Sequence, residues 1–221
     1  MGERTRIVNR VKAGLVRLGL RGFEPTLRNA AERLEALRTP EGGALPPNML
    51  AELRRDMARL RCVAEQIGRV EEARLERLER QPAAGRNAMV RLLARGVGVG
   101  VETADMLVHE VLSRDLRDRR AVARYAGLTG APDESGSRRR EKGLAEAGSA
   151  RVRRGMLQLA WRFLPHQKGS ALARWYRART ADARGGTRKT LIVALARKLL
   201  VGLWQLVATG KVPEGLVLRP A

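Results

Sequence analysis

Apolar residues recur every three or four positions in each long segment of this chain, which is the spacing of one face of an α-helix. The first such segment covers residues 3–19. A second is expected from Pro25 to Arg38 with Leu27 on its inner face, and a turn-rich loop follows over 39–47. No segment has the strict alternation that is typical of a strand. The pattern therefore predicts an all-α protein.

The longest expected helix covers residues 48–80, which contain no proline and a single glycine, Gly68. At 1.5 Å per residue it would be about 50 Å long. Its apolar positions alternate by three and four residues, as in a heptad seam of about two and a half repeats: Leu50, Leu53, Met57, Leu60, Ala64 and Ile67. This favours either a coiled-coil-like arm or helical hairpin that self-associates, or an ordinary long helix packed on its own domain.

A change in composition at Pro82-Ala-Ala-Gly85 predicts a domain boundary. Residues 1–82 are expected to form a helical, coiled-coil-like connector, and residues 83–221 a compact helical domain. The helices of this second domain are expected at 87–94, 101–112, 118–126, 149–164, 169–180 and 187–209, with Pro165 ending the fourth.

The first two helices of that domain are joined by Arg95-Gly-Val-Gly-Val-Gly100. Helix, glycine loop and helix are the pattern of a helix-hairpin-helix. In such a unit Gly96, Gly98 and Gly100 would let the backbone approach a nucleic-acid phosphate, whose charge is met by N–H groups at the start of the second helix. A plain connector between two helices has the same pattern, so both interpretations stay open.

The net charge of the chain indicates that this helical protein binds anions. The 44 Lys+Arg residues against 23 Asp+Glu give a net charge of +21 over 221 residues, which predicts salt-dependent binding to a polyanion. Arg accounts for 38 of the cations, and its planar fork binds phosphate through two hydrogen bonds. A GC-rich codon bias would explain the excess of Arg over Lys but not the net charge. From Arg117 onward the chain carries +16 of the +21, so the working surface is expected there.

Other classes of function are disfavoured. No stretch approaches the ~18 to 20 unbroken apolar residues of a membrane span, and the charged N-terminus lacks a signal peptide. We expect a cytoplasmic, nucleoid-associated protein with no membrane contact. Cys62 alone cannot form an internal disulfide, and His109 and His166 are too few for a structural zinc site. Any metal would have to be held by carboxylates.

A glycine-rich segment after Tyr125 carries the candidate chemistry. Ser135 is a candidate hydroxyl nucleophile in an expected flexible loop. A serine attacks phosphorus only when a base or metal takes its proton and cations neutralise the developing charge; nothing nearby clearly supplies the base. On its own, Ser-Gly in a loop reads as a turn. The cations that follow it are candidate phosphate ligands: Arg138, Arg139, Arg140, Lys142, Arg151, Arg153 and Arg154.

Several separated motifs from about residue 86 to 218 resemble one family. They are Leu93-Ala-Arg-Gly-Val-Gly-Val-Gly-Val-Glu-Thr-Ala-Asp-Met-Leu, Arg120-Ala-Val-Ala-Arg-Tyr-Ala-Gly-Leu-Thr, Ser135-Gly, Gly143-Leu-Ala-Glu-Ala-Gly-Ser-Ala-Arg-Val-Arg, Ser170-Ala-Leu-Ala-Arg-Trp175 and Ile192-Val-Ala-Leu-Ala-Arg-Lys198. Their order and spacing are similar to the C-terminal half of the insertion-sequence transposases related to the pilin-gene invertase, the bridge-RNA-guided recombinases.

The resemblance implies a role for Ser135. In that family a serine in a Ser-Gly pair attacks DNA to form a phosphoserine link, and an N-terminal RNase-H-like domain carries four metal-binding carboxylates. The match begins at what resembles the family's connecting coiled coil, so the carboxylate domain is expected to be absent here. Mg²⁺ is expected only together with that domain, and DNA, a guide RNA and a second copy of the chain are the expected partners.

One departure from the family pattern concerns charge. The family usually has Gly-Ile-Ser-Lys-x-Gly-Asn where this chain has Gly143-Leu-Ala-Glu146-Ala-Gly-Ser149, so Glu146 reverses a charge near the expected phosphate. Two hypotheses follow. The chain is the serine-bearing part of a DNA transposase, inactive in isolation, or it is a catalytically dead remnant that only binds nucleic acid. A general RNA-binding protein is less favoured, because base-stacking aromatic residues are scarce.

Overall fold

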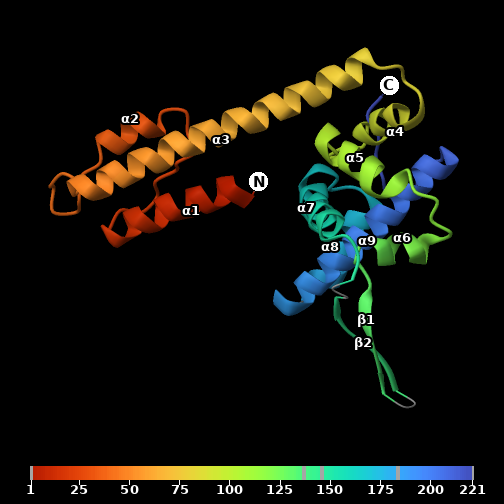
Figure 1. Ribbon diagram of the computed structural model, residues 1–221. Helices are drawn as coiled ribbons and strands as arrows, with labels where there is room; N and C mark the ends of the chain where they lie inside the picture. The colour runs from red at the N-terminus through yellow and green to blue at the C-terminus, as the bar shows by residue number, and fades with distance from the viewer. Residues whose placement is uncertain (1, 136–137, 145–146, 183–184, 221) are drawn as a thin grey trace. The chain divides into compact units, whose positions relative to one another are not determined.

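The structure, a computed structural model, describes residues 2–135, 138–144, 147–182 and 185–220; for 131–135 and 138–143 it describes the backbone only. It contains two compact units, Met1–Glu76 and Arg77–Ala221, called unit 1 and unit 2 below (Figure 1). The sequence boundary at residues 82 and 83 lies a few residues beyond this division, and the longest helix runs across the division.

Unit 1 is built around the long helix. Its elements are α1 (Gly2–Arg17), α2 (Ala30–Glu35) and α3 (Pro47–Arg80), the last continuing into unit 2. One apolar face of α1 packs against the first half of α3, and the buried side chains that form this core include Ile7, Val11, Leu15, Leu53, Met57 and Leu60. The first half of the predicted heptad seam is therefore occupied by helices of the same unit, as expected for an ordinary amphipathic helix.

The second expected helix is shorter than predicted. Only Ala30–Glu35 is helical, and Leu27, expected on the inner face, is 46% exposed. The preceding residues form two successive turns, in which the amide of Leu27 donates to Glu24 and that of Ala30 donates to Leu27. These local turns take the place of helical hydrogen bonds, and helical periodicity alone does not reveal them.

Unit 2 is a helical bundle with a hairpin. Its elements are α4 (Gly85–Ala94), α5 (Val101–Leu107), the π-helix η1 (Val108–Leu112), α6 (Arg119–Tyr125), β1 (Gly130–Ser135), β2 (Arg138–Leu144), α7 (Ala150–His166), α8 (Ala171–Thr180) and α9 (Gly185–Thr209). The helix ends lie within two residues of the expected positions, but the helix from Val101 finishes as the π-helix η1, and α7 is not ended by Pro165, since it continues to His166.

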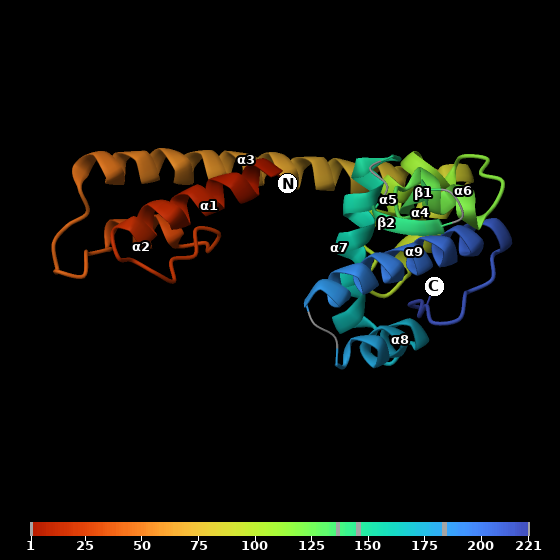
Figure 2. The same ribbon diagram turned by 90° about the horizontal axis from the view of Figure 1, so that it is seen from below.

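Helix α9 lies at the centre of unit 2, with α4, α5 and α6 along one side and α8 along the other (Figure 2). It is the one helix in the described ranges that is long and apolar enough to cross a membrane. Its apolar face is instead buried in the protein core against α7 and α6. Arg197 and Lys198 interrupt its apolar sequence and are both exposed. The predicted all-α class is confirmed for the helical body.

The segment expected to be a flexible loop contains a two-stranded antiparallel sheet. Strands β1 and β2 form a hairpin that extends away from the helices of unit 2 (Figure 1). The register places Asp133 opposite Arg140 and Glu134 opposite Arg139. Opposite charges at facing positions stabilise a strand pair, whereas the hydrophobic alternation that identifies most strands is absent here. The sequence pattern therefore missed this element.

Candidate nucleic-acid interface

Both ends of the hairpin segment meet at the C-terminus of α6. The amide of Ser149 donates to the carbonyl of Tyr125 over 2.7 Å, and the Ser149 hydroxyl caps α7 by accepting from the amide of Val152. Gly148 has a φ of +94°, and a Cβ there would lie 2.6 Å from the amide nitrogen of Gly127 and from the Tyr125 carbonyl oxygen. Only glycine permits this approach, so the backbone fixes where the hairpin begins and ends.

Ser135 is the last residue of β1 and faces Arg138, the first residue of β2. Gly136, the partner of the Ser-Gly pair, lies outside the described residues, as does Glu146. Facing residues of an antiparallel pair share a face, and the face alternates along each strand. Positions 135, 138, 140 and 142 therefore belong to one face of the hairpin, and position 139 belongs to the other.

The three α7 arginines that the sequence grouped with Ser135 have different surroundings. Arg151 donates to the Glu110 carboxylate over 3.0 Å. Arg153 is half-buried, and its guanidinium lies where a Cβ on Gly127 would be. Arg154 is exposed and donates to Ala150 in its own helix. The structure does not bring these three side chains together in one site.

The glycine loop between α4 and α5 packs on the C-terminal segment. The amide of Val97 donates to Val217, and Gln167 donates to the Val97 carbonyl over 2.6 Å. Close packing leaves little room for a side chain at Gly96 and Gly98. A Cβ would lie 2.9 Å from the Val99 side chain at position 96 and 3.3 Å from the His166 side chain at position 98. Gly100 has open space around it. The amides of 96, 97 and 99 donate within the protein, and phosphate binding by this loop stays a prediction.

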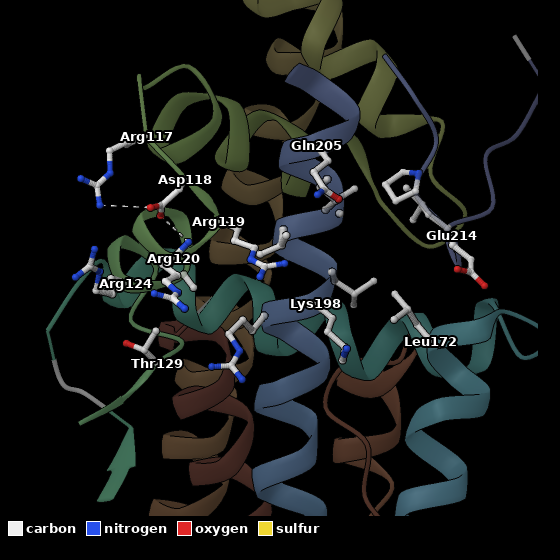
Figure 3. Close-up of a pocket in the computed structure, with 18 of the residues that line it drawn as sticks. Arg117, Asp118, Arg119, Arg120, Arg124, Thr129, Leu172, Lys198, Gln205 and Glu214 are labelled. Carbon is white, nitrogen blue, oxygen red and sulfur yellow. Dashed lines mark hydrogen bonds and ion pairs between the residues drawn. The ribbon is translucent and has the colours of Figure 1, made fainter. Parts of the chain in front are cut away.

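A groove of about 1120 Å³ lies over α9 (Figure 3). Its floor is an exposed stripe of α9 at helical spacing: Arg197, Lys198, Val201, Gly202 and Gln205. One side is formed by residues 117–124 together with Thr129 and Gly130, at the start of the hairpin. The other is formed by Leu172 of α8 and the segment around Glu214.

The groove is strongly cationic. Six cations line it against two carboxylates: Arg117, Arg119, Arg120, Arg124, Arg197 and Lys198. Of the two carboxylates, Asp118 is already used to cap α6, accepting from the amides of Arg120 and Ala121 over 2.8 Å. The hydrogen bond from the Ala121 amide, followed by that from Arg120, lowers the pKa of Asp118. Its charge is thus directed at the helix terminus.

Four of these guanidinium groups have no acceptor within the described part of the chain: those of Arg119, Arg120, Arg124 and Arg197. Lys198 is held over the ring of Trp175, 5.0 Å from its centroid. A concave surface whose cations are not neutralised by protein carboxylates raises the local concentration of anions. The arrangement suits the phosphates of a nucleic acid.

Sequence reasoning missed this groove. Its cations come from segments some 75 residues apart, so no single motif contains them. One signal was available: Arg197 and Lys198 interrupt an otherwise apolar helix at the spacing of its exposed face. His109, which the sequence offered as an isolated histidine, does not line this groove; its Nδ1 lies 3.3 Å from a carboxylate oxygen of Asp105.

The donors that a metal would need are not gathered in the part of the chain that the structure describes. Within those residues no three His, Cys, Asp or Glu side chains lie close enough together to hold an ion. The described residues therefore contain no ligand set for the Mg²⁺ that the family resemblance implies, and we derive no chemical step through it.

Residues 90–177 match the family described as "Transposase IS116/IS110/IS902 family". This range runs from α4 to α8 and includes the hairpin, so the similarity to that family lies within unit 2. The chain is also similar to the "Putative transposase y4rJ" of Sinorhizobium fredii (strain NBRC 101917 / NGR234), with 42% identity over 226 residues. The alignment covers 98% of this chain and 57% of that relative. The chain thus spans little more than half the length of the curated protein it matches.

Proposed function

We infer that this chain acts in the transposition of an IS110-type insertion sequence by binding DNA and supplying the serine that attacks it. The observation that carries the proposal is the position of Ser135 at the end of β1, inside the matched transposase domain and on the hairpin face that includes positions 138, 140 and 142. The net charge of unit 2 supports the proposal, since residues 77–221 contain 29 Lys+Arg and only 12 Asp+Glu.

The proposed step is a transesterification. The Ser135 Oγ forms a bond to a DNA phosphorus, the bond from that phosphorus to one backbone oxygen breaks, and the serine proton leaves to a base. The departing sugar oxygen takes up a proton, so a phosphoserine diester and a free hydroxyl result. Arg138 and Arg140 would neutralise charge on the pentacovalent phosphorus. The base and any Mg²⁺ are proposed to come from a carboxylate domain of the kind the resemblance implies.

Two further partners are proposed. A guide RNA follows from the family resemblance. Self-association through α3 is supported by Val70 and Leu75, which are 58% and 45% exposed although both are large apolar side chains. Large apolar side chains exposed on a helix are often sites of contact with another helix.

The test is a covalent adduct between the protein and labelled donor DNA. The chain is combined with the carboxylate domain of a close relative, guide RNA, Mg²⁺ and donor DNA, and adducts are resolved on a denaturing gel. We expect an adduct with the wild type and none with Ser135→Ala, and no DNA cleavage by the chain without the added domain.

Ser137→Ala is the matched control, because it removes the next hydroxyl along the chain. It should leave the adduct yield unchanged. An adduct that forms equally well with Ser135→Ala would disprove the nucleophile assignment. If DNA binds normally and no variant forms an adduct, the chain is the non-catalytic binder of the alternative hypothesis.

A further inference from the structure

We propose that the groove over α9 binds one strand of nucleic acid and leads it to the base of the hairpin. The inference rests on the proposed nucleic-acid binding and adds the site and the kind of ligand. It concerns residues outside the Ser-Gly motif and outside the glycine loop.

The position of the cations indicates a ligand that enters the groove. Arg197 and Lys198 of α9 both line the groove. Figure 3 shows Lys198 on α9 and Arg120 on the α6 side. A strand lying along α9 therefore has cations beneath it and beside it. A rigid duplex carries its phosphates on the outside of a wide cylinder and would meet mainly the rims of such a groove. Grooves that track a single backbone with positive charge are typical of single-strand binding.

The apolar part of the lining supports the same choice. Leu172 and Pro213 lie on the side opposite α6, and the partly exposed Val201 lies along α9. Only an unpaired strand exposes the faces and edges of its bases and much of its sugar surface, which are buried by stacking and pairing in a duplex. A groove with phosphate ligands on one side and apolar surface on the other matches the two sides of such a strand.

The groove also has a defined outlet. Thr129 and Gly130 line it where β1 begins, and Ala147 lines it where the segment after β2 returns. The start of β1 and the returning segment at Ala147 are both next to the place where the backbones of Gly127 and Gly148 touch. A strand bound over α9 therefore reaches the two ends of the hairpin that carries Ser135.

The experiment is fluorescence anisotropy with the intact chain and three labelled probes of equal length: a dT 20-mer, an rU 20-mer and a mixed-sequence DNA duplex. The groove variant is Arg120→Ala with Arg197→Ala. Both side chains are exposed and lack an acceptor among the described residues. We expect single-strand binding to weaken roughly tenfold to a hundredfold, as for the loss of two charged phosphate contacts, and duplex binding to weaken much less.

The matched control is Arg86→Ala with Arg188→Ala, which removes the same charge from exposed positions of unit 2 outside the groove lining. It should leave single-strand binding within about threefold. The slope of log affinity against log salt should fall by roughly 0.7 per lost phosphate contact in the groove variant. Unchanged circular dichroism and Tm confirm that both variants are folded.

Each outcome decides between hypotheses. Equal losses with dT and rU identify recognition of the shared backbone, and a loss with only one identifies the strand that the groove takes. Equal losses in the groove and control variants, or an equal loss of duplex binding, overturn the single-strand groove. If the wild type binds duplex DNA without this preference, the proposed function stands and the groove inference fails; if it binds none of the probes, both fail.

Discussion

Units 1 and 2 use the same basic residue in different ways. In unit 1, 15 Lys+Arg accompany 11 Asp+Glu, and several cations form ion pairs between segments. The Arg10 guanidinium donates to both carboxylate oxygens of Asp56 on α3, and Arg54 donates to both oxygens of Glu35 in the same way. In unit 2 the cations outnumber the acids by 29 to 12, and the guanidinium groups of Arg119, Arg120, Arg124 and Arg197 in the groove have no such acceptor among the described residues. Total charge therefore says less about function than the presence or absence of a carboxylate opposite each cation.

The largest effect expected from this difference is the salt dependence of DNA binding. Raising the salt from ~50 to ~200 mM should reduce duplex affinity on the order of a thousandfold or more, because several phosphate contacts are lost together. Substituting Arg138, Arg139 and Arg140 by Ala together should weaken binding and flatten the salt slope by up to about 0.9 per contact. Anisotropy titrations at several salt concentrations measure both.

The control for this prediction comes from unit 1. Arg17, Arg21 and Arg28 are exposed and have no acceptor within the described residues, so their joint replacement by Ala removes the same charge. It should change DNA affinity little. A comparable loss would mean that net charge alone drives binding.

The register of the hairpin gives a second test, which measures adduct formation. Replacing Arg138 and Arg140 by Ala should reduce adduct formation more than Arg139→Ala does, since position 139 is on the face opposite Ser135.

The next effect concerns the rigidity of the hairpin base. Gly148→Ala should destabilise unit 2 by at least about 2 kcal/mol, because the new Cβ meets three backbone atoms of 124–127 at 2.6 to 2.7 Å and φ is +94°. Gly169→Ala is the control, with open space at its Cβ and no positive φ. Urea unfolding followed by circular dichroism compares them. Similar midpoints for the two variants would contradict the close approach.

The smallest effect is a pH-dependent one at the edge of the groove. The amides of Ala121 and Arg120 lower the pKa of Asp118 in the folded chain. Its carboxylate therefore stabilises the fold above the unfolded pKa of about 3.9, and this contribution disappears as the pH falls through the lower folded value. The Tm of Asp118→Asn should lie slightly below that of the wild type at pH 7, and the gap should close toward pH 2. A constant gap would mean that the charge has no role in the cap.

The helices were predictable because each buries one apolar stripe in the core of its own unit. In α1, α3 and α7 the apolar residues recur regularly at helical spacing, and the buried apolar residues of these helices lie at the positions that this spacing places on the inner face. The length of α2 was not predictable, since local turns compete with the helix at Leu27. The hairpin was missed because its facing positions hold charged residues, such as Glu134 and Arg139, and its strands lack apolar alternation.

The candidate site was only partly accessible to sequence reasoning. Ser135 could be singled out, but only through a family resemblance, because the base that would activate it has no local sequence signature. Arg197 and Arg120 lie 77 positions apart, and only the packing of α6 on α9 brings them to one groove. The glycines at 127 and 148 could be read as loop residues, whereas their reason for being glycine is contact between two backbones.

That contact has a consequence for how the protein can change. The chain leaves the helical body after Leu128, whose side chain is buried in the core, and re-enters it at Gly148, whose backbone touches that of Gly127. The intervening segment is thus a modular insertion: it can lengthen, shorten or be exchanged with the corresponding segment of a relative while the surrounding helices keep their connection. Selection or an engineer could therefore alter the chemistry of the hairpin and the groove of the bundle separately.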